Sequence, residues 1–270
     1  MHGKAIEIFL LDGSIDGIVT AELTNWNGKA IKLPRTEVSS CKRQDITGTG
    51  VYFLFCKEDD NTDSVYIGEA ENVKDRLVNH INDYNSDKEP YYWTTAVMYV
   101  GTNLNKADIR YMEDKLVELA KTTGRYKVLT QKTYKNTKMK ESQIAMAEEF
   151  IDNIKIIIST LGYRIFEEVP QATSSTKYLY CKGNNGDATG FPSAGGFTVL
   201  KGSRISDHKV NSLKHKFREK LVADGTIVDS VFVKDYEFSS PSGASSTILG
   251  RPSNGNEDWK TEDGTKLKDL

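Results

Sequence analysis

The sequence predicts an α+β protein with a small antiparallel three-stranded sheet flanked by helices. Three short apolar segments favour β-structure, namely Val51–Cys56, Ser64–Gly68 and Trp93–Val100. Polar turn residues separate the first two, which predicts an antiparallel pair. Apolar residues recur at three- and four-residue steps in 72–84 and 106–122, which predicts a helix on either side of the third strand.

The composition indicates a protein that can bury a core and stay in solution. Of the 270 residues, 38% are hydrophobic and 27% charged, enough for two modest domains or one domain with appendages. No apolar run approaches the length of a membrane span, and the first residues lack the features of a signal peptide. The three scattered cysteines favour reduced thiols rather than disulfides or a zinc site. We therefore expect a cytoplasmic protein with no membrane partner.

Charge is distributed in blocks along the chain. The net charge of −2 gives no general indication of nucleic-acid binding, but residues 121–140 contain basic side chains and no acid. This segment is either a solvated surface or a contact for phosphates, and we favour DNA contact. The candidate DNA-binding residues are Arg125, Lys127, Lys132, Lys135 and Lys138.

The first predicted helix, 72–84, carries two polar side chains beside its apolar stripe. Asn72 is a suitable N-cap. Arg76 and His80 are four residues apart, so they lie one above the other on the helix surface. They either point back toward the two tyrosine-bearing strands or belong to a solvated flank.

The second predicted helix, 106–122, contains a carboxylate where apolar residues are expected. Asn105 and Asp108 predict its capping box. Glu113 lies within the apolar face, between Leu116 and Val117 on a helical wheel. A buried carboxylate is costly without compensation, so Glu113 either pairs with an Arg or Lys or binds a metal ion.

The ordered set of these residues resembles the GIY-YIG nuclease family over about residues 47–122. The matching positions are Gly50-Val51-Tyr52, Tyr66-Ile67-Gly68, Arg76, His80 and Glu113. Each triplet is a weak signal alone, whereas the set on strand, strand, helix and helix is fairly specific. The first triplet reads Gly-Val-Tyr, a conservative apolar change.

The resemblance implies an endonuclease that hydrolyses DNA phosphodiester bonds with one divalent metal ion. It implies that Glu113 binds Mg²⁺ or Mn²⁺, which suits a hard carboxylate oxygen. Arg76 would hold the phosphate, and Tyr66 would position the phosphate or the attacking water. The general base would be Tyr52, helped by the metal or by His80, or else His80 itself.

One departure from the family pattern leaves an alternative open. The family usually has an asparagine in the turn after the metal-binding helix, but 124–131 contains none. Thr130 or Gln131 is the candidate substitute. The alternative is a catalytically weak or inactive nucleic-acid-binding protein that keeps the nuclease fold; a protein-interaction domain with a buried polar core is the third hypothesis.

We predict four segments along the chain. They are an N-terminal β-hairpin appendage (1–46), a nuclease-like domain (47–135), a long helix (136–170) and a C-terminal α+β module (171–270). In the last, 207–223 predicts a basic helix with Phe217 inward and Arg218 outward, a candidate DNA contact, and 226–233 predicts a strand. The final residues, from about Phe238, resemble a domain of unknown function that often accompanies these nucleases. The sequence does not predict an oligomeric state.

Overall fold

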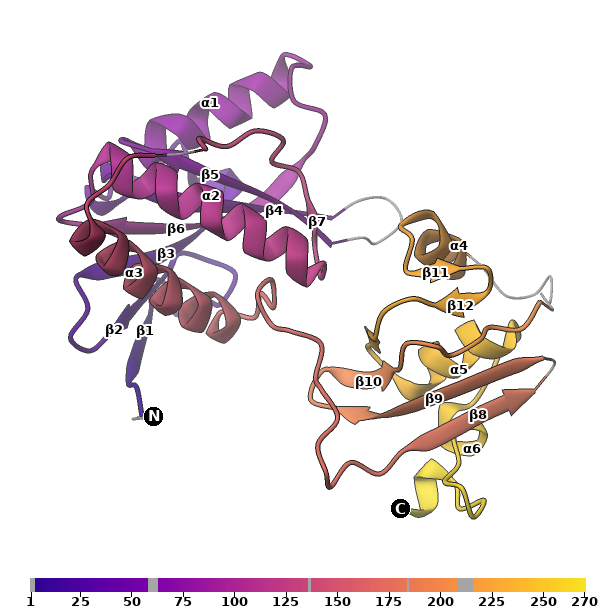
Figure 1. Cartoon of the computed structure of the whole chain (residues 1–270). Helices are drawn as coiled ribbons and strands as arrows, with labels where there is room; N and C mark the ends of the chain where they lie inside the picture. Colours follow the sequence, from indigo (N-terminus) through magenta and orange to yellow (C-terminus); the bar gives the residue numbers. More distant parts are fainter. Residues whose placement is uncertain (1–2, 58–62, 136, 184, 208–215) are drawn as a thin grey trace. The chain divides into compact units, whose positions relative to one another are not determined.

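The computed structural model describes residues 3–57, 63–135, 137–183, 185–207 and 216–270. Contacts divide the chain into two compact units, Met1–Glu167 and Glu168–Leu270 (Figure 1). The boundary predicted from the sequence lies between residues 170 and 171, close to the observed one. Each unit is described by itself below.

One sheet runs through the first unit. Within the described residues its strands are β1 (Ile6–Leu10), β2 (Val19–Leu23), β3 (Gly28–Pro34), β4 (Gly50–Lys57), β5 (Asp63–Ala70), β6 (Trp93–Gly101) and β7 (Lys127–Val128). Their spatial order is β1-β2-β3-β6-β4-β5-β7. All neighbours are antiparallel except β5 and β7, which are parallel.

The sheet is larger than the sequence analysis expected. The three predicted strands are adjacent, in the order β6-β4-β5, but they form the centre of a seven-stranded sheet in the part of the chain described here. β3 pairs with β6 from Gly28 opposite Gly101 to Pro34 opposite Thr95. The expected N-terminal appendage is thus wrong, because these strands complete the edge of β6, whose backbone groups would otherwise lack partners. The spacing of apolar residues predicts a strand but does not identify its neighbour.

Helices cover both faces of this sheet (Figure 1). On one face the alternate β4 residues Val51, Phe53 and Phe55 pack with α2 (Lys106–Thr123) and α3 (Glu141–Thr160). On the other, Tyr52 and Leu54 pack in the same cluster as residues of α1 (Val73–Asn85). Side chains alternate along a strand, so this register places Tyr52 on the face that α1 covers.

Both helices that carry predicted site residues begin at the expected caps. The Asn72 side chain accepts a hydrogen bond from the Asp75 amide. Asn105 and Asp108 form the predicted capping box, and Gly124 ends α2 in the left-handed conformation. These caps fix where each helix starts and therefore which side chains face the sheet. Two short 3₁₀-helices lie nearby, η1 (Arg35–Glu37) and η2 (Asp45–Thr47).

The second unit has its own sheets and core. Its described strands are β8 (Leu179–Gly183), β9 (Gly186–Ser193), β10 (Gly196–Val199), β11 (Ile227–Val228), β12 (Val231–Phe232) and β13 (Tyr236–Phe238). Its helices are α4 (Lys216–Ala223), α5 (Pro241–Leu249), α6 (Gly255–Asp258) and η3 (Leu267–Asp269). The sheet order is β13-β10-β9-β8, with β11 and β12 forming a separate pair. Trp259 lies in the core, where its indole N–H donates to the Pro241 carbonyl at 3.0 Å.

Two local predictions for this unit are wrong. The expected strand 226–233 is a hairpin, because Asp229 and Ser230 adopt positive φ angles of 49° and 63° and reverse the chain. In α4, Arg218 is buried and donates to the Ser206 carbonyl, whereas Phe217 is 43% exposed. The rest of the predicted helix, residues 208–215, lies outside the described residues.

Candidate active site

Two glycines allow the tyrosine-bearing strands to approach their neighbours closely. In the β4–β5 register, Tyr52 lies opposite Gly68. A Cβ at Gly68 would lie 2.4 Å from the Tyr52 hydroxyl oxygen, and one at Gly50 would lie 2.0 Å from the Tyr99 carbonyl oxygen. The Tyr52 and Tyr66 rings stack with centroids 6.2 Å apart. The glycines of both triplets are therefore required by the packing around the tyrosines.

Tyr52 begins a chain of two hydrogen bonds. Its hydroxyl oxygen lies 2.9 Å from Nε2 of His80, and Nδ1 of His80 lies 2.6 Å from Oε1 of Glu89. Burial lowers the pKa of His80 to about 3, with Arg76 and Arg35 adding to the effect, so the imidazole is neutral near pH 7. A neutral imidazole has a single N–H, and a carboxylate only accepts. The proton therefore lies on Nδ1, and the Tyr52 hydroxyl donates to Nε2.

Glu89 is the member of this chain that the sequence analysis missed. It lies in the loop after α1, where the Asp83 carbonyl accepts hydrogen bonds from the Lys88 and Glu89 amides. Asp87 adopts a φ of 56° in the same loop. Burial raises the pKa of Glu89, while Arg76 opposes the shift. Nothing in the sequence distinguishes this glutamate from other acids in a polar loop, because its contact depends on how the loop folds back.

Arg76 and Tyr66 form the more accessible side of the site, next to the buried Tyr52. Arg76 and Tyr66 are half-buried, whereas Tyr52 is only 1% exposed. Burial lowers the pKa of Arg76, but its interactions with Tyr52 and Tyr66 outweigh this and raise the pKa overall. Burial raises the pKa of Tyr52 well above its ordinary value, so its hydroxyl is protonated. A fixed positive charge thus lies next to two neutral hydroxyl groups.

Glu113 carries a carboxylate in a largely buried position on α2. It is 6% exposed, and among the described residues no hydrogen bond or ion pair reaches it. Burial raises the pKa of Glu113 to about 7, with Glu69 the next largest cause. Two nearby cations, Lys106 and Arg110, partly offset this rise, but their ion pairs are with Glu69: Lys106 Nζ lies 2.8 Å from one of its oxygens and Arg110 Nε 3.7 Å from the other. The pairing considered from the sequence is therefore not found.

The charge of Glu113 acts on the two tyrosines, although α2 and α1 pack on opposite faces of the sheet. The Glu113 charge raises the pKa of both Tyr52 and Tyr66, after the larger effect of burial. In the described part of the chain, no three His, Cys, Asp or Glu side chains are grouped to hold a metal. A single carboxylate fits an ion such as Mg²⁺, which is often bound by one or two carboxylates with water and substrate phosphates completing its shell.

Thr130 supports the second tyrosine strand where the family asparagine was expected. Its hydroxyl accepts from the Ile67 amide at 2.8 Å and donates to the Ile67 carbonyl at 2.7 Å. Thr130 is 3% exposed, while Gln131 lies on the surface. Of the two candidate substitutes, Thr130 is the one that holds the strand.

We expect Thr130→Val to lower the free energy of unfolding of the first unit by about 1–3 kcal/mol, because two buried backbone groups lose their partner. Thermal unfolding and hydrogen exchange at the Ile67 amide measure the effect. Thr130→Ser keeps the hydroxyl and is expected to retain most of the protection. Parental exchange at Ile67 in the valine variant would contradict this role.

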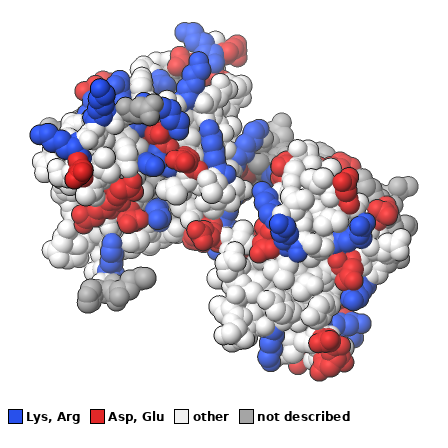
Figure 2. Space-filling model, viewed as in Figure 1, with Lys and Arg blue, Asp and Glu red and all other residues white. Residues whose placement is uncertain are grey.

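The predicted basic contacts are not equivalent in the structure. The side chain of Arg125 is half-buried and donates to the Glu167 carbonyl. Lys135 Nζ lies 2.6 Å from an Asp114 oxygen. The four lysines among the candidates are all exposed, namely Lys127, Lys132, Lys135 and Lys138. Figure 2 shows Lys and Arg interspersed with Asp and Glu on the face in view, rather than one continuous basic surface.

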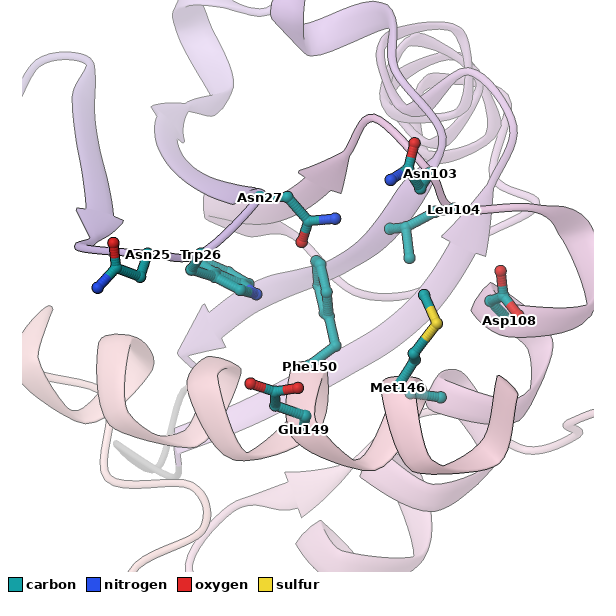
Figure 3. A pocket seen from close by; sticks show the side chains of 10 residues that line it. Asn25, Trp26, Asn27, Asn103, Leu104, Asp108, Met146, Glu149 and Phe150 are labelled. Carbon is teal, nitrogen blue, oxygen red and sulfur yellow. The ribbon is translucent and has the colours of Figure 1, made fainter. Parts of the chain in front are cut away.

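A separate pocket of about 230 Å³ lies among the β2–β3 turn, the start of α2, and α3 (Figure 3). Trp26 and Phe150 form its aromatic wall, with ring centroids 4.7 Å apart. Asn25, Asn27 and Asn103 contribute amides to its lining. None of the predicted site residues lines it, so it is distinct from the tyrosine site.

Comparison with known families gives a match for the C-terminal part of the chain. Residues 179–270 match a family described as "Domain of unknown function (DUF4357)". The expected C-terminal domain of unknown function is therefore supported, whereas no GIY-YIG family match is found. No curated protein and no solved structure matches the chain. Among the described residues, no helix is both long and apolar enough to cross a lipid bilayer.

Proposed function

We propose that the chain is a divalent-metal-dependent endonuclease that hydrolyses DNA phosphodiester bonds. The observation that carries the proposal is Glu113, a buried carboxylate with no hydrogen bond or ion pair to the described residues, whose charge acts on Tyr52 and Tyr66. Arg76 in turn interacts with both tyrosines. A protein gains nothing for stability by keeping such a group, so a cation is its natural partner. Mg²⁺ or Mn²⁺ bound there would polarise the scissile phosphate and stabilise the departing 3′ oxygen.

The protein groups supply the remaining functions. Arg76 binds the phosphate and offsets its growing negative charge. Tyr66, the more exposed tyrosine, orients the phosphate or the attacking water. Because His80 is completely buried, it accepts a proton from water only through Tyr52. The exposed lysines of the basic segment, Lys127, Lys132 and Lys138, contribute sequence-independent contacts to DNA.

Incubation of the full chain with plasmid and single-stranded DNA tests this proposal. We expect cleavage with Mg²⁺ or Mn²⁺ and none with a chelator, since the buried carboxylate requires a cation to act. Products ending in a 5′ phosphate are expected, because the 3′ oxygen leaves. Salt-sensitive DNA binding without cleavage under any divalent ion would instead support the non-catalytic alternative. A protein that neither binds nor cleaves DNA would overturn both the nuclease proposal and the non-catalytic alternative.

A further inference from the structure

We infer that Glu89 is a positioning residue that holds His80 in the tautomer able to accept the Tyr52 proton. This inference rests on the proposed function. Glu89 does not touch the reacting atoms; it acts through the two hydrogen bonds that link Tyr52, His80 and Glu89.

The geometry leaves few other states for His80. The imidazole is completely buried, and its Nδ1 lies 2.6 Å from Oε1 of Glu89. The Glu89 side chain is 14% exposed. The second oxygen of Glu89 is buried and has no hydrogen-bond partner among the described residues. Since Glu89 offers only acceptors, Nδ1 keeps its hydrogen and Nε2 keeps its lone pair toward Tyr52.

Charged groups on neighbouring elements act on this pair. Arg76, from the same helix as His80, and Arg35, from the N-terminal segment, disfavour a second proton on the imidazole. Asp83 and Tyr91 also face Glu89. The Arg35 guanidinium lies over three aromatic rings, those of Tyr84, Tyr92 and Trp93, at 5.1, 4.7 and 4.7 Å from their centroids. Because these cations disfavour the imidazolium form of His80, that form is short-lived. The Glu89 carboxylate stabilises it when it forms.

In the proposed reaction, the proton released by the attacking water is replaced on Tyr52 as Tyr52 passes its own proton to His80. As the water oxygen forms its bond to phosphorus, the water gives a proton to the Tyr52 oxygen, and Tyr52 gives its own hydroxyl proton to His80 Nε2. The bond from phosphorus to the 3′ oxygen breaks, and that oxygen takes a proton from solvent. His80 is then a cation hydrogen-bonded to the Glu89 carboxylate, and it returns its proton to solvent through Tyr52.

Two substitutions separate the charge of Glu89 from its acceptor oxygen. Glu89→Gln keeps an oxygen that accepts from Nδ1 but removes the charge that stabilises the imidazolium. Glu89→Leu removes both. We expect a reduction in kcat of about 100-fold for leucine and a smaller one for glutamine, with KM for DNA little changed. Asp87→Asn, which removes a carboxylate from the same loop, is expected to cleave like the parent.

Nitrogen NMR of the metal-free and DNA-free protein gives a second readout, with His80→Gln identifying the signals. In the parent and Glu89→Gln we expect Nδ1 to carry the hydrogen, and in Glu89→Leu we expect hydrogen on Nε2 to become populated. Hydrogen on Nε2 in the parent, or parental kcat in the leucine variant, would overturn the inference. Absence of cleavage by the parent would overturn the proposed function, while the tautomer would still be measured.

Discussion

Glu113→Gln is expected to abolish metal-dependent cleavage while making the metal-free protein more stable above pH 7. The amide has nearly the shape of the carboxyl group but carries no charge, so it binds a divalent cation poorly. Loss of the cation's stabilisation of the phosphate and leaving oxygen should reduce the cleavage rate by about 10³-fold or more. Replacing a carboxylate that forms a stabilising ion pair with an amide would instead make the protein less stable.

The stability effect follows from the raised pKa of Glu113. Its ordinary pKa of 4.5 becomes about 7 in the folded protein, because burial and Glu69 disfavour the charged form. An acid whose pKa is raised by folding destabilises the folded state as the pH rises from the unfolded value through the folded one. The penalty is complete above about pH 7 and absent below about pH 4. Glutamine removes it, a gain of about 1–3 kcal/mol at pH 8.

Thermal unfolding at pH 4 and pH 8, with and without Mg²⁺ or Mn²⁺, measures both effects. The parent should gain stability from the metal at pH 8, and the variant should gain little. Glu118→Gln is the matched control, because Glu118 lies on the same helix with 61% of its side chain exposed. A variant that is less stable than the parent at pH 8, or that still cleaves, would contradict the assignment of Glu113.

Arg76→Ala is expected to lower the cleavage rate by about 10²- to 10³-fold. The substitution removes the cation that interacts with both tyrosines and that would bind the phosphate, and Arg76 is half-buried, so solvent screens its charge incompletely. The same change removes a charge that disfavours protonation of His80, so the pKa of His80 should rise. Cleavage rates across pH and titration of His80 by NMR measure the two effects.

Arg76→Lys tests the shape of the group as well as its charge. Lysine restores a positive charge but lacks the planar fork that binds two phosphate oxygens, so we expect an intermediate rate. Arg43→Ala is a suitable control, because Arg43 pairs with Asp45 at 2.5 Å and belongs to no part of the site. Equal cleavage by the parent and Arg76→Ala would exclude a role for this arginine in phosphate binding.

The sequence predicts local structure well where a single helix or strand determines it. The caps at Asn72 and Asn105 and the strands carrying Tyr52 and Tyr66 occur where expected. For Glu113 the sequence left a basic partner and a metal ion as alternatives, because helical periodicity shows that a residue faces inward but not what it meets.

Features that depend on contacts distant in sequence were not predictable in this way. Pairing of β3 with β6 joins segments separated by the whole β4–β5–α1 region, and no periodicity encodes that choice. Glu89 reaches His80 only because the loop after α1 folds back, so that the Glu89 amide donates a hydrogen bond to the Asp83 carbonyl of the helix. Arg218 is buried against the chain before its helix, so a wheel drawn for α4 alone gave the wrong orientation.

The order of the strands also has a consequence for biosynthesis. A ribosome releases β1, β2 and β3 first, yet β3 must wait for β6, whose residues Trp93–Gly101 are made much later. Until then one edge of the nascent hairpins is unpaired and open to incorrect partners. Arg35, at the end of β3, reaches its aromatic rings only once Trp93 has been made. Completion of the sheet therefore depends on pairing between segments far apart in the sequence.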